Sequence, residues 1–366
     1  MAGSSFGSIF RITTWGESHG AGLGVVVDGC PAGLPLCEED IQIFLNRRKP
    51  GQSKFATPRK EDDTVEILSG VFEGKTTGTP ISMLVRNTSQ RSRDYSEIAS
   101  YYRPGHADYT FDEKYGFRDY RGGGRSSGRE TIGRVAAGAV ASKLLATLGI
   151  SLTTYTRSIG PVTIKTFDMT QIEQNKLYMP DADAAAEASA YLLHCMKEQN
   201  SSGGIVECIV NGLPTGLGDP VFEKLDANLG KAILSIGAVK AFEIGDGMAV
   251  ASATGRSNND PFLPGENGAI RKASNHAGGV LGGISDGSPL ILRAAIKPTP
   301  SIASFQDTVN KQGKPISVSI KGRHDPIIVP RAVVVVESMT ALVLADALLL
   351  NMTATMDNVK KIYTDK

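Results

Sequence analysis

The stretch ETIGRVAAGAVASKLLATLG (residues 130–149) carries the clearest secondary-structure signal in the chain. Its apolar residues, from Ile132 through Val135 to Leu148, recur with the i, i+3, i+4 spacing of a helix. Gly149 follows as a residue suited to the left-handed position after a helix end. The sequence therefore predicts a helix over 130–148, with a glycine- and arginine-rich segment leading into it.

Outward from this helix, the patterns predict a mixture of helices and strands. Further helices are expected at Glu38–Lys49, at Asp181–Glu198 with an Asp cap, from Asp219-Pro220 onward, and at Pro330–Met352. Strands are expected at Leu23–Asp28, Thr64–Val71, Thr79–Val85, Gly204–Val210, Met248–Ala253, Leu290–Ile296 and Ile316–Ile320. Because helices and strands do not alternate strictly, an α+β fold is favoured over a doubly wound α/β sheet.

A faint internal repeat joins the two halves of the chain. VFEGKTTGTPISMLV (71–85) aligns without gaps with VLGGISDGSPLILRA (280–294), sharing Val, two Gly and Pro at the same offsets. This pattern fits either a duplicated half-domain or two similar hairpins. No linker rich in Pro, Ser or charge divides the chain, so we expect a single domain over residues 1–366 with possible internal pseudo-symmetry.

Composition excludes several classes of protein. Of 366 residues, 41% are hydrophobic and 21% charged, and the net charge is +1, which argues against a general nucleic-acid binder. No apolar run is expected to reach the roughly 18–20 residues of a membrane span, and the start lacks the apolar core of a signal peptide. Four cysteines without a CxxC pair predict reduced, mostly buried thiols and a cytoplasmic protein.

Positive charge is concentrated near the front of the chain. Residues 41–135 carry 17 Lys and Arg against 12 Asp and Glu. Within them, RGGGRSSGRET (121–131) leads into the predicted helix, whose N-terminus offers unpaired N–H groups to an anion. Arg125 and Arg129 could add bidentate contacts to phosphate or carboxylate. The charge and the loop together predict a pocket for a small, highly charged anion.

Two glycine-flanked histidines are candidates for acid–base chemistry. His19 lies in WGESHG (15–20) and His106 in RPGHAD (103–108), beside Arg103. Glycine lets the backbone approach a ligand closely, and a loop histidine can then reach it. The competing interpretation is a histidine that only stabilises a turn, and the pattern by itself leaves that open.

Three further segments are candidates with strong structural alternatives. RRKPGQSK (47–54) offers Arg48 and Lys54, although cations at a helix end are favoured by the helix dipole alone. KPTPS (297–301) follows a predicted strand. RHDP (323–326) offers Asp325 as a general base or a helix cap. No metal-ligand pattern is found in the sequence, and neither a phosphate loop nor a dinucleotide fingerprint survives inspection.

Taken together, these segments resemble the chorismate synthase family closely. The matching stretches run in order from about residue 6 to 350: FRITTWGESHG, GCPAGLPL, RRKPGQSKFATPRKEDD, GKTTGTPI, YRPGHADYT, RGGGRSSGRETIGRVAAGAVA, SIGAVKAFEIGDG, NHAGGVLGGISDG, KPTPSI, GRHDP and AVVVVESMTALVLADALL. GESHG, RPGHAD and GRSSGRET are the most specific of them. The resemblance implies a single large β-α-β sandwich and a homotetramer.

The resemblance also implies an activity. Members eliminate phosphate from 5-enolpyruvylshikimate 3-phosphate to give chorismate, and they need reduced FMN although there is no net redox change. The flavin is thought to lend an electron as phosphate leaves and to regain it when a hydrogen is lost from C6. A substrate with two carboxylates and a phosphate agrees with the basic front third of the chain.

Residue roles follow from the same resemblance. His19 matches the histidine near the reduced flavin, His106 the acid that assists phosphate departure, and Asp325 the carboxylate that helps remove the C6 hydrogen through flavin N5. Substrate-binding positions are Arg48, Lys54, Arg103, Arg129 and Arg323. Flavin-binding positions are Arg125, Ser126, Ser127, Gly237, Ala238, Gly282, Lys297, Pro298, Thr299, Pro300, Ser301 and Arg323.

Two departures and several alternatives stay open. Lys54 stands where many members have Arg, which keeps the charge but loses the fork geometry. Gly237 stands where many have Asn, so a side-chain contact to the flavin is absent there. NADPH could reduce the flavin on the protein, with a contact near Arg48 and Lys54, but the lack of an extended insert favours an external reductase. The rival functions are a basic-patch protein for RNA or acidic partners, and a flavin-independent phosphate lyase.

Overall fold

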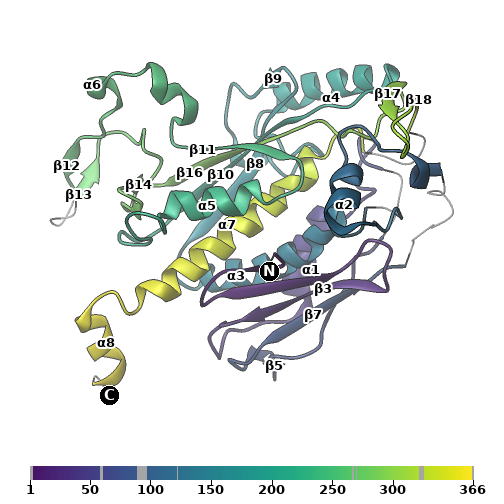
Figure 1. Cartoon of the computed structure of the whole chain (residues 1–366). Coiled ribbons are helices and arrows are strands. Elements are labelled where there is room, and N and C mark those ends of the chain that lie inside the picture. Colours follow the sequence, from purple (N-terminus) through teal and green to yellow (C-terminus); the bar gives the residue numbers. More distant parts are fainter. Residues whose placement is uncertain are drawn as a thin grey trace.

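The computed structural model describes residues 3–57, 61–88, 97–121, 123–265, 268, 270–320 and 325–364. Two five-stranded antiparallel sheets enclose a layer of helices (Figure 1). The first sheet has the order β1 (Ser5–Phe6), β2 (Arg11–Gly16), β3 (Gly22–Asp28), β7 (Ile81–Arg86) and β4 (Val65–Ile67). The second has the order β11 (Val239–Ile244), β16 (Leu290–Ile296), β10 (Gly204–Asn211), β8 (Ser151–Ile159) and β9 (Val162–Thr163).

Four helices form the central layer, and the remaining elements lie around it. The central helices are α1 (Glu38–Arg48), α3 (Thr131–Ala146), α5 (Leu225–Leu234) and α7 (Val329–Asn351). Outside them lie α2 (Asp108–Tyr115), α4 (Ala182–Lys197), α6 (Gly255–Asn258) and α8 (Met356–Tyr363). The hairpins are β5 (Val71–Phe72) with β6 (Lys75–Thr76), β12 (Phe262–Pro264) with β13 (Ile270–Lys272), β14 (Val280–Leu281) with β15 (Ile284–Ser285), and β17 (Gln306–Val309) with β18 (Pro315–Val318).

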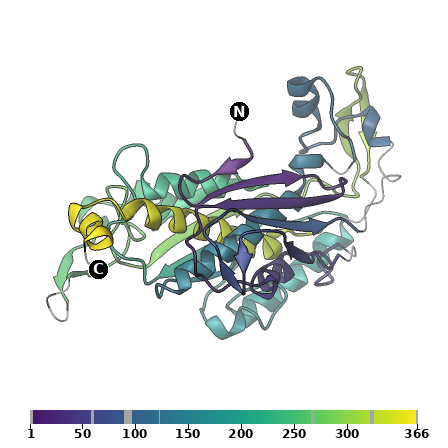
Figure 2. The same ribbon diagram turned by 90° about the horizontal axis from the view of Figure 1, so that it is seen from below.

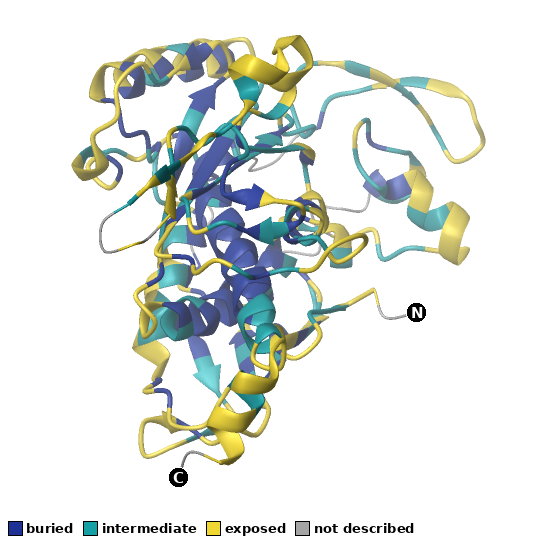
Figure 3. Cartoon of the chain, turned by 90° about the vertical axis from the view of Figure 1, so that its left-hand side faces the viewer, coloured by how far each residue is buried: buried dark blue, intermediate teal, exposed yellow. Residues whose placement is uncertain are grey.

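The helix α7 crosses the whole molecule between the sheets, and burial colouring shows its buried length (Figure 3). At 23 residues it is long and apolar enough to span a membrane, so the expectation that no apolar run reaches that length is wrong. Most of its apolar window is nevertheless buried inside the protein. A helix that is apolar on all sides can be the centre of a layered core, since it meets apolar neighbours in every direction.

The two halves of the chain repeat one topology. The order strand, strand, helix, strand, hairpin, strand, helix occurs as β2, β3, α1, β4, β5–β6, β7, α3 and again as β8, β10, α5, β11, β14–β15, β16, α7. The second half has β9 and α4 inserted after β8, and α6 with β12–β13 inserted after β11. The strand order is also the same, β2-β3-β7-β4 in one sheet and β8-β10-β16-β11 in the other. The structure thus confirms internal pseudo-symmetry, and the sequence echo falls on equivalent hairpin–strand units.

Most predicted elements are confirmed, within the usual uncertainty at their ends. Asp181 caps α4 by accepting from Ala184 N–H at 3.0 Å, and Gly149 has the expected positive φ of 75°. Of the four cysteines, all are free thiols; Cys30, Cys195 and Cys208 are buried and Cys37 is exposed. The α+β fold is confirmed as well.

Three predicted elements are wrong. The helix expected from Asp219-Pro220 begins only at Leu225, because Val221 adopts φ 68° and cannot continue a right-handed helix. The single strand expected over Thr64–Val71 is two short strands, separated where Gly70 turns the chain at φ 82°. The residues Met248–Ala253 lie largely in a 3-10 helix, Gly247–Ser252.

The two pseudo-equivalent connections after β7 and after β16 are long, and they meet beside the sandwich. The first carries α2 and the second carries β17–β18, which lie side by side in both views (Figures 1 and 2). Tyr102 N–H donates to Val309 C=O at 3.2 Å, and Lys311 N–H donates to Ser100 C=O at 3.0 Å. Pseudo-symmetry therefore brings together two segments that lie about 200 residues apart.

Candidate active site

The histidine His106 lies where these two connections meet. Its Nδ1 is 2.9 Å from Pro104 C=O, and its Nε2 is 2.9 Å from Ser301 Oγ. Lys297 Nζ donates to Gly105 C=O at 2.8 Å, which ties the segment 297–301 to the same turn. Gly105 has φ 68°, and a Cβ there would lie 2.8 Å from Pro300 Cβ, so glycine permits this close approach.

Hydrogen-bond chemistry defines which forms of His106 this turn accepts. A carbonyl oxygen only accepts, so Nδ1 carries the proton. Nε2 faces a hydroxyl, which can donate to a neutral ring or accept from a charged one. Both the neutral and the protonated imidazole are therefore accommodated, as a residue that delivers a proton requires.

The predicted flavin segment 297–301 is hydrogen-bonded to the chain that follows α5. Lys297 N–H donates to Ala238 C=O at 2.9 Å. Ala238 has φ 73°, and Gly237 beside it is exposed with open space where a Cβ would stand. Thr299 Oγ1 is buried, and it lacks a hydrogen-bond partner among the described residues.

The anion loop is anchored to the first sheet. Arg125 donates to Thr14 Oγ1 at 2.7 Å and to Gly16 C=O at 3.2 Å. Ser126 Oγ donates back to Gly123 C=O at 2.7 Å, and Ser127 caps the next turn by accepting from Arg129 N–H at 3.3 Å. Arg125 therefore fixes the loop against the edge that precedes His19.

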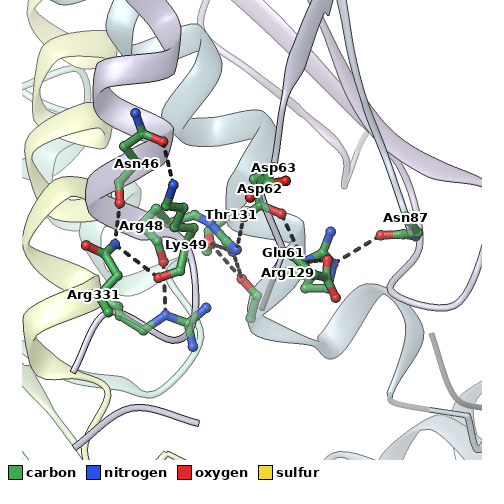
Figure 4. Close-up of polar contacts among 12 residues, drawn as sticks. Asn46, Arg48, Lys49, Glu61, Asp62, Asp63, Asn87, Arg129, Thr131 and Arg331 are labelled. Carbon is green, nitrogen blue, oxygen red and sulfur yellow. Dashed lines mark hydrogen bonds and ion pairs between the residues drawn. The ribbon is translucent and has the colours of Figure 1, made fainter. Parts of the chain in front are cut away.

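Two predicted anion-binding arginines share one buried carboxylate (Figure 4). Arg48 Nη2 lies 2.8 Å from Asp63 Oδ2, and Arg129 Nη1 lies 3.2 Å from Asp63 Oδ1. Glu61 pairs with Arg129 as well. Burial lowers the pKa of Arg48 to about 10, against the opposing effect of Asp63, while Arg48 and Arg129 hold the pKa of Asp63 below its usual range despite burial.

A third arginine is engaged in a similar way. Arg103 donates from Nε to Asp108 Oδ2 at 2.7 Å and from Nη2 to Asp108 Oδ1 at 2.8 Å. Both residues are buried, and this bidentate pair closes the RPGHAD turn that presents His106. Burial raises the pKa of Asp108, but hydrogen bonds from Arg103 outweigh it and the net shift is downward.

The carboxylate of Asp325 is held at both oxygens. Thr57 N–H donates to Oδ1 at 2.7 Å, and Arg331 Nη1 donates to Oδ2 at 2.7 Å. Arg331 also donates from Nε to Arg48 C=O at 2.9 Å, so Asp325 and the Arg48 cluster belong to one polar network. Arg323, predicted to contact both substrate and flavin, lies outside the described residues.

Hydrogen bonds of Arg134 connect α3, which follows the anion loop, with the segment after α5. Arg134, in the first turn of α3, donates to Ser235 Oγ at 2.6 Å and to Ser235 C=O at 3.2 Å. Ser235 precedes Gly237 by two residues. The helix that follows the anion loop is therefore hydrogen-bonded to the segment 235–238, and that segment is in turn hydrogen-bonded to Lys297.

Three predicted site residues, His19, Lys54 and Gly282, lie away from the contacts described above. His19 is half-buried, with Nδ1 3.2 Å from Ser18 Oγ. Lys54 is exposed at the rim of a cavity of about 690 Å³ between residues 52–55 and 171–189. Gly282 lies in the β14–β15 turn beside the start of α5, whereas Gly237 follows its end, roughly 15 Å away by helix rise.

Sequence reasoning missed the residues that hold the arginines in place. Asp63, Asp108 and Arg331 all contact predicted site residues, but none was a candidate. The acidic run Glu61-Asp62-Asp63 inside the basic region was a usable signal, because buried arginines require carboxylate partners. Their spacing from Arg129 in the sequence gave no hint of contact.

The structure defines an α+β protein with two sheets around a helical layer, in which several of the predicted site arginines pair with buried carboxylates. The chain belongs to the chorismate synthase family, whose model matches residues 10–349. It is 74% identical to "Chorismate synthase" of Agathobacter rectalis over 99% of both chains, and 67% identical to that of Lachnospira eligens over 99% of this chain and all of the relative.

A solved structure supports the same conclusion. The chain matches a structure titled "Crystal Structure of Chorismate Synthase" with a TM-score of 0.78 and 34% identity, over 98% of both chains. The resemblance predicted from the motifs is therefore confirmed along nearly the whole length. The roles of individual residues stay predictions.

Proposed function

We propose that this protein eliminates phosphate from 5-enolpyruvylshikimate 3-phosphate to form chorismate, the last step of the shikimate pathway, with reduced FMN as cofactor. Family membership supports the reaction. The observation that carries the site assignment is the position of His106 between Pro104 C=O and Ser301 Oγ, where the two pseudo-equivalent connections meet.

In this proposal His106 donates the proton that neutralises the departing phosphate. The Pro104 carbonyl keeps Nδ1 protonated, so Nε2 is the nitrogen that exchanges a proton with the substrate. Ser301 Oγ is the hydrogen-bond partner of Nε2 in this structure, and an anionic oxygen of the substrate would replace it. His19, in the turn between β2 and β3, is proposed to lie beside the flavin.

The arginine clusters would hold the substrate's three anionic groups. Arg48, Arg103 and Arg129 each contact a carboxylate in this structure, which fixes their orientation. The substrate's carboxylates and phosphate would compete with those internal carboxylates for the guanidinium hydrogens. Arg323 and Lys54 remain proposed contacts from the resemblance.

The described residues fit a flavin at the segment 297–301. Thr299 Oγ1 is buried without a described partner, which suits a hydrogen bond to a polar ligand edge, and the space beside Gly237 is open. Residues Arg125, Ser126, Ser127, Ala238 and Lys297 would line the same path. Reduced FMN, when bound, supplies an electron to the substrate and regains it, so the reaction has no net redox change.

The carboxylate of Asp325 is proposed to take part in removing the proton from C6. Its two hydrogen bonds, from Thr57 N–H and Arg331, fix its orientation. Because Arg331 also holds the carbonyl of Arg48, substrate anions at the arginine cluster and the proton acceptor would be positioned by one network.

Self-association and location are also proposals. Large apolar side chains are exposed on the segment that carries α6, β12 and β13 and on α8, which lie toward the same side of the molecule (Figure 1). Among them are Met248, Phe262, Ile270, Met356 and Tyr363. Exposed apolar area of this kind suits burial against other copies, in agreement with a homotetramer. The family and the buried free thiols support a cytoplasmic enzyme.

The test is anaerobic turnover of 5-enolpyruvylshikimate 3-phosphate with chemically reduced FMN, followed by the absorbance of chorismate. Turnover with pre-reduced FMN is the expected result, and a parallel assay with oxidised FMN and NADPH reports whether the protein reduces its own flavin. Full activity without any flavin would support the flavin-independent lyase instead. No chorismate with flavin demonstrably bound would refute the proposal.

A further inference from the structure

The buried residue Asp63 joins two arginines that reach it from different helices. Arg48 comes from the C-terminal end of α1 and Arg129 from the turn before α3. The Asp63 side chain is 0% exposed, and those of Arg48 and Arg129 are 2% and 7% exposed. At such burial an ion pair is weakly screened and its geometry is rigid.

Each oxygen of Asp63 serves a different arginine. Oδ2 accepts from Arg48 Nη2 at 2.8 Å and Oδ1 from Arg129 Nη1 at 3.2 Å. Arg48 Nη1 also lies 3.3 Å from Gly128 C=O and from Thr131 Oγ1, one residue before and two residues after Arg129 (Figure 4). Without the carboxylate, two guanidinium groups would face each other in a buried space and repel.

The backbone of Asp63 is itself fixed in place. It adopts φ 49°, a left-handed conformation that Asp tolerates better than most residues. Gln42 Nε2 donates to Asp63 C=O at 3.3 Å, and Gln42 Oε1 accepts from Val65 N–H at 3.1 Å. The helix α1 thus holds both Arg48 and the segment that carries its partner carboxylate.

We propose that Asp63 is a positioning residue for the anion site: it fixes the Arg48 and Arg129 guanidinium groups relative to each other and does not touch the substrate. This inference rests on the proposed function, in which the two arginines hold substrate anions. The surrounding charges are Glu61 on Arg129, and Arg331 with Asp325 beyond the Arg48 carbonyl.

Two substitutions separate charge from geometry. Asp63→Asn keeps the size of the side chain and tolerates the same backbone conformation, but it removes the charge and places an amide N–H₂ against one arginine. Asp63→Glu keeps the charge and adds a methylene in a fully buried space. We expect the KM for 5-enolpyruvylshikimate 3-phosphate to rise about 10- to 100-fold in Asp63→Asn, with a smaller change in kcat, and to rise less in Asp63→Glu.

The matched control is Asp286→Asn. Asp286 is a buried carboxylate (its side chain is 7% exposed) that pairs with Lys272 Nζ at 2.7 Å, close to β14 and away from the arginines. The Asp286→Asn variant loses a buried ion pair of the same kind, while Asp260 still pairs with Lys272. Its KM should stay within about twofold of wild type, since a merely structural defect lowers the active fraction and not the affinity.

A second readout is independent of turnover. Binding of inorganic phosphate, measured by calorimetry on the full-length protein loaded with FMN, should weaken at least tenfold in Asp63→Asn and stay unchanged in Asp286→Asn. An unchanged phosphate affinity and KM in folded Asp63→Asn would overturn the inference, as would an equal loss in Asp286→Asn. If wild type binds phosphate in an Asp63-dependent manner but forms no chorismate, the proposed function fails and the positioning role stands.

Discussion

Substituting Gly138 with alanine tests the close crossing of α3 and α7. A Cβ at position 138 would lie 2.2 Å from Ser338 Cβ and 2.6 Å from Ser338 Cα. Carbon atoms in contact normally stand about 3.5–4.0 Å apart, so the helices would have to separate by roughly 1–1.5 Å. Ser338 is 0% exposed, and neither of its two atoms can rotate away from the clash.

Two opposing free energies decide the sign of the effect. Alanine gains about 1 kcal/mol over glycine in a helix interior. Overpacking a dense core costs about 1–3 kcal/mol or more, and a clash with backbone belongs at the upper end. We expect Gly138→Ala to lose about 2 kcal/mol of unfolding free energy.

The assay is equilibrium unfolding in urea followed by circular dichroism, with the midpoint compared between variants. Gly133→Ala in the same helix is the matched control, because its Cβ would meet Thr14 Cγ2 and Gly24 C=O at 3.1 Å, a contact that small shifts can relieve. Its free energy of unfolding should stay within about 1 kcal/mol of wild type. A Gly138→Ala variant as stable as wild type would refute the crossing geometry.

Three further outcomes are expected. His106→Ala should lower kcat about 10²- to 10⁴-fold at saturating reduced FMN, and near wild-type kcat would contradict its role as proton donor. Asp325→Asn should slow turnover while flavin still binds by fluorescence titration; loss of flavin binding would instead mark a structural role. Asp181→Ala should remove the α4 cap and lower the free energy of unfolding by about 1 kcal/mol. Backbone N–H groups of Lys165, Ala184 and Thr166 lower the pKa of Asp181, so its stabilising effect is present above about pH 4 and is lost on acidification toward the lowered value. Urea midpoints of wild type and variant that stay equally far apart from pH 7 to pH 2 would contradict that assignment.

Local patterns in the sequence predicted the elements whose physics is local. The helix around Val135 and the strand Leu290–Ile296 were predictable from local patterns. An apolar stripe at helical spacing, or alternating apolar and polar residues in a strand, indicates which side chains are buried. The strands β2 and β8 were missed, since their threonine- and arginine-rich sequences are buried only by neighbours far away in the chain. Similarly, Val221 shows how one left-handed residue delays a helix start that Asp219-Pro220 alone favours.

The sequence by itself also determined the family and the chemical types at the site, because motif residues such as His106, Arg125 and Arg129 stand in recognisable local contexts. Only the tertiary structure decided which groups meet. His106 reaches Ser301 across 195 positions, and Asp63 joins two helices through its two oxygens. Such contacts depend on how two sheets and four helices stack around buried apolar area, which no short-range pattern encodes.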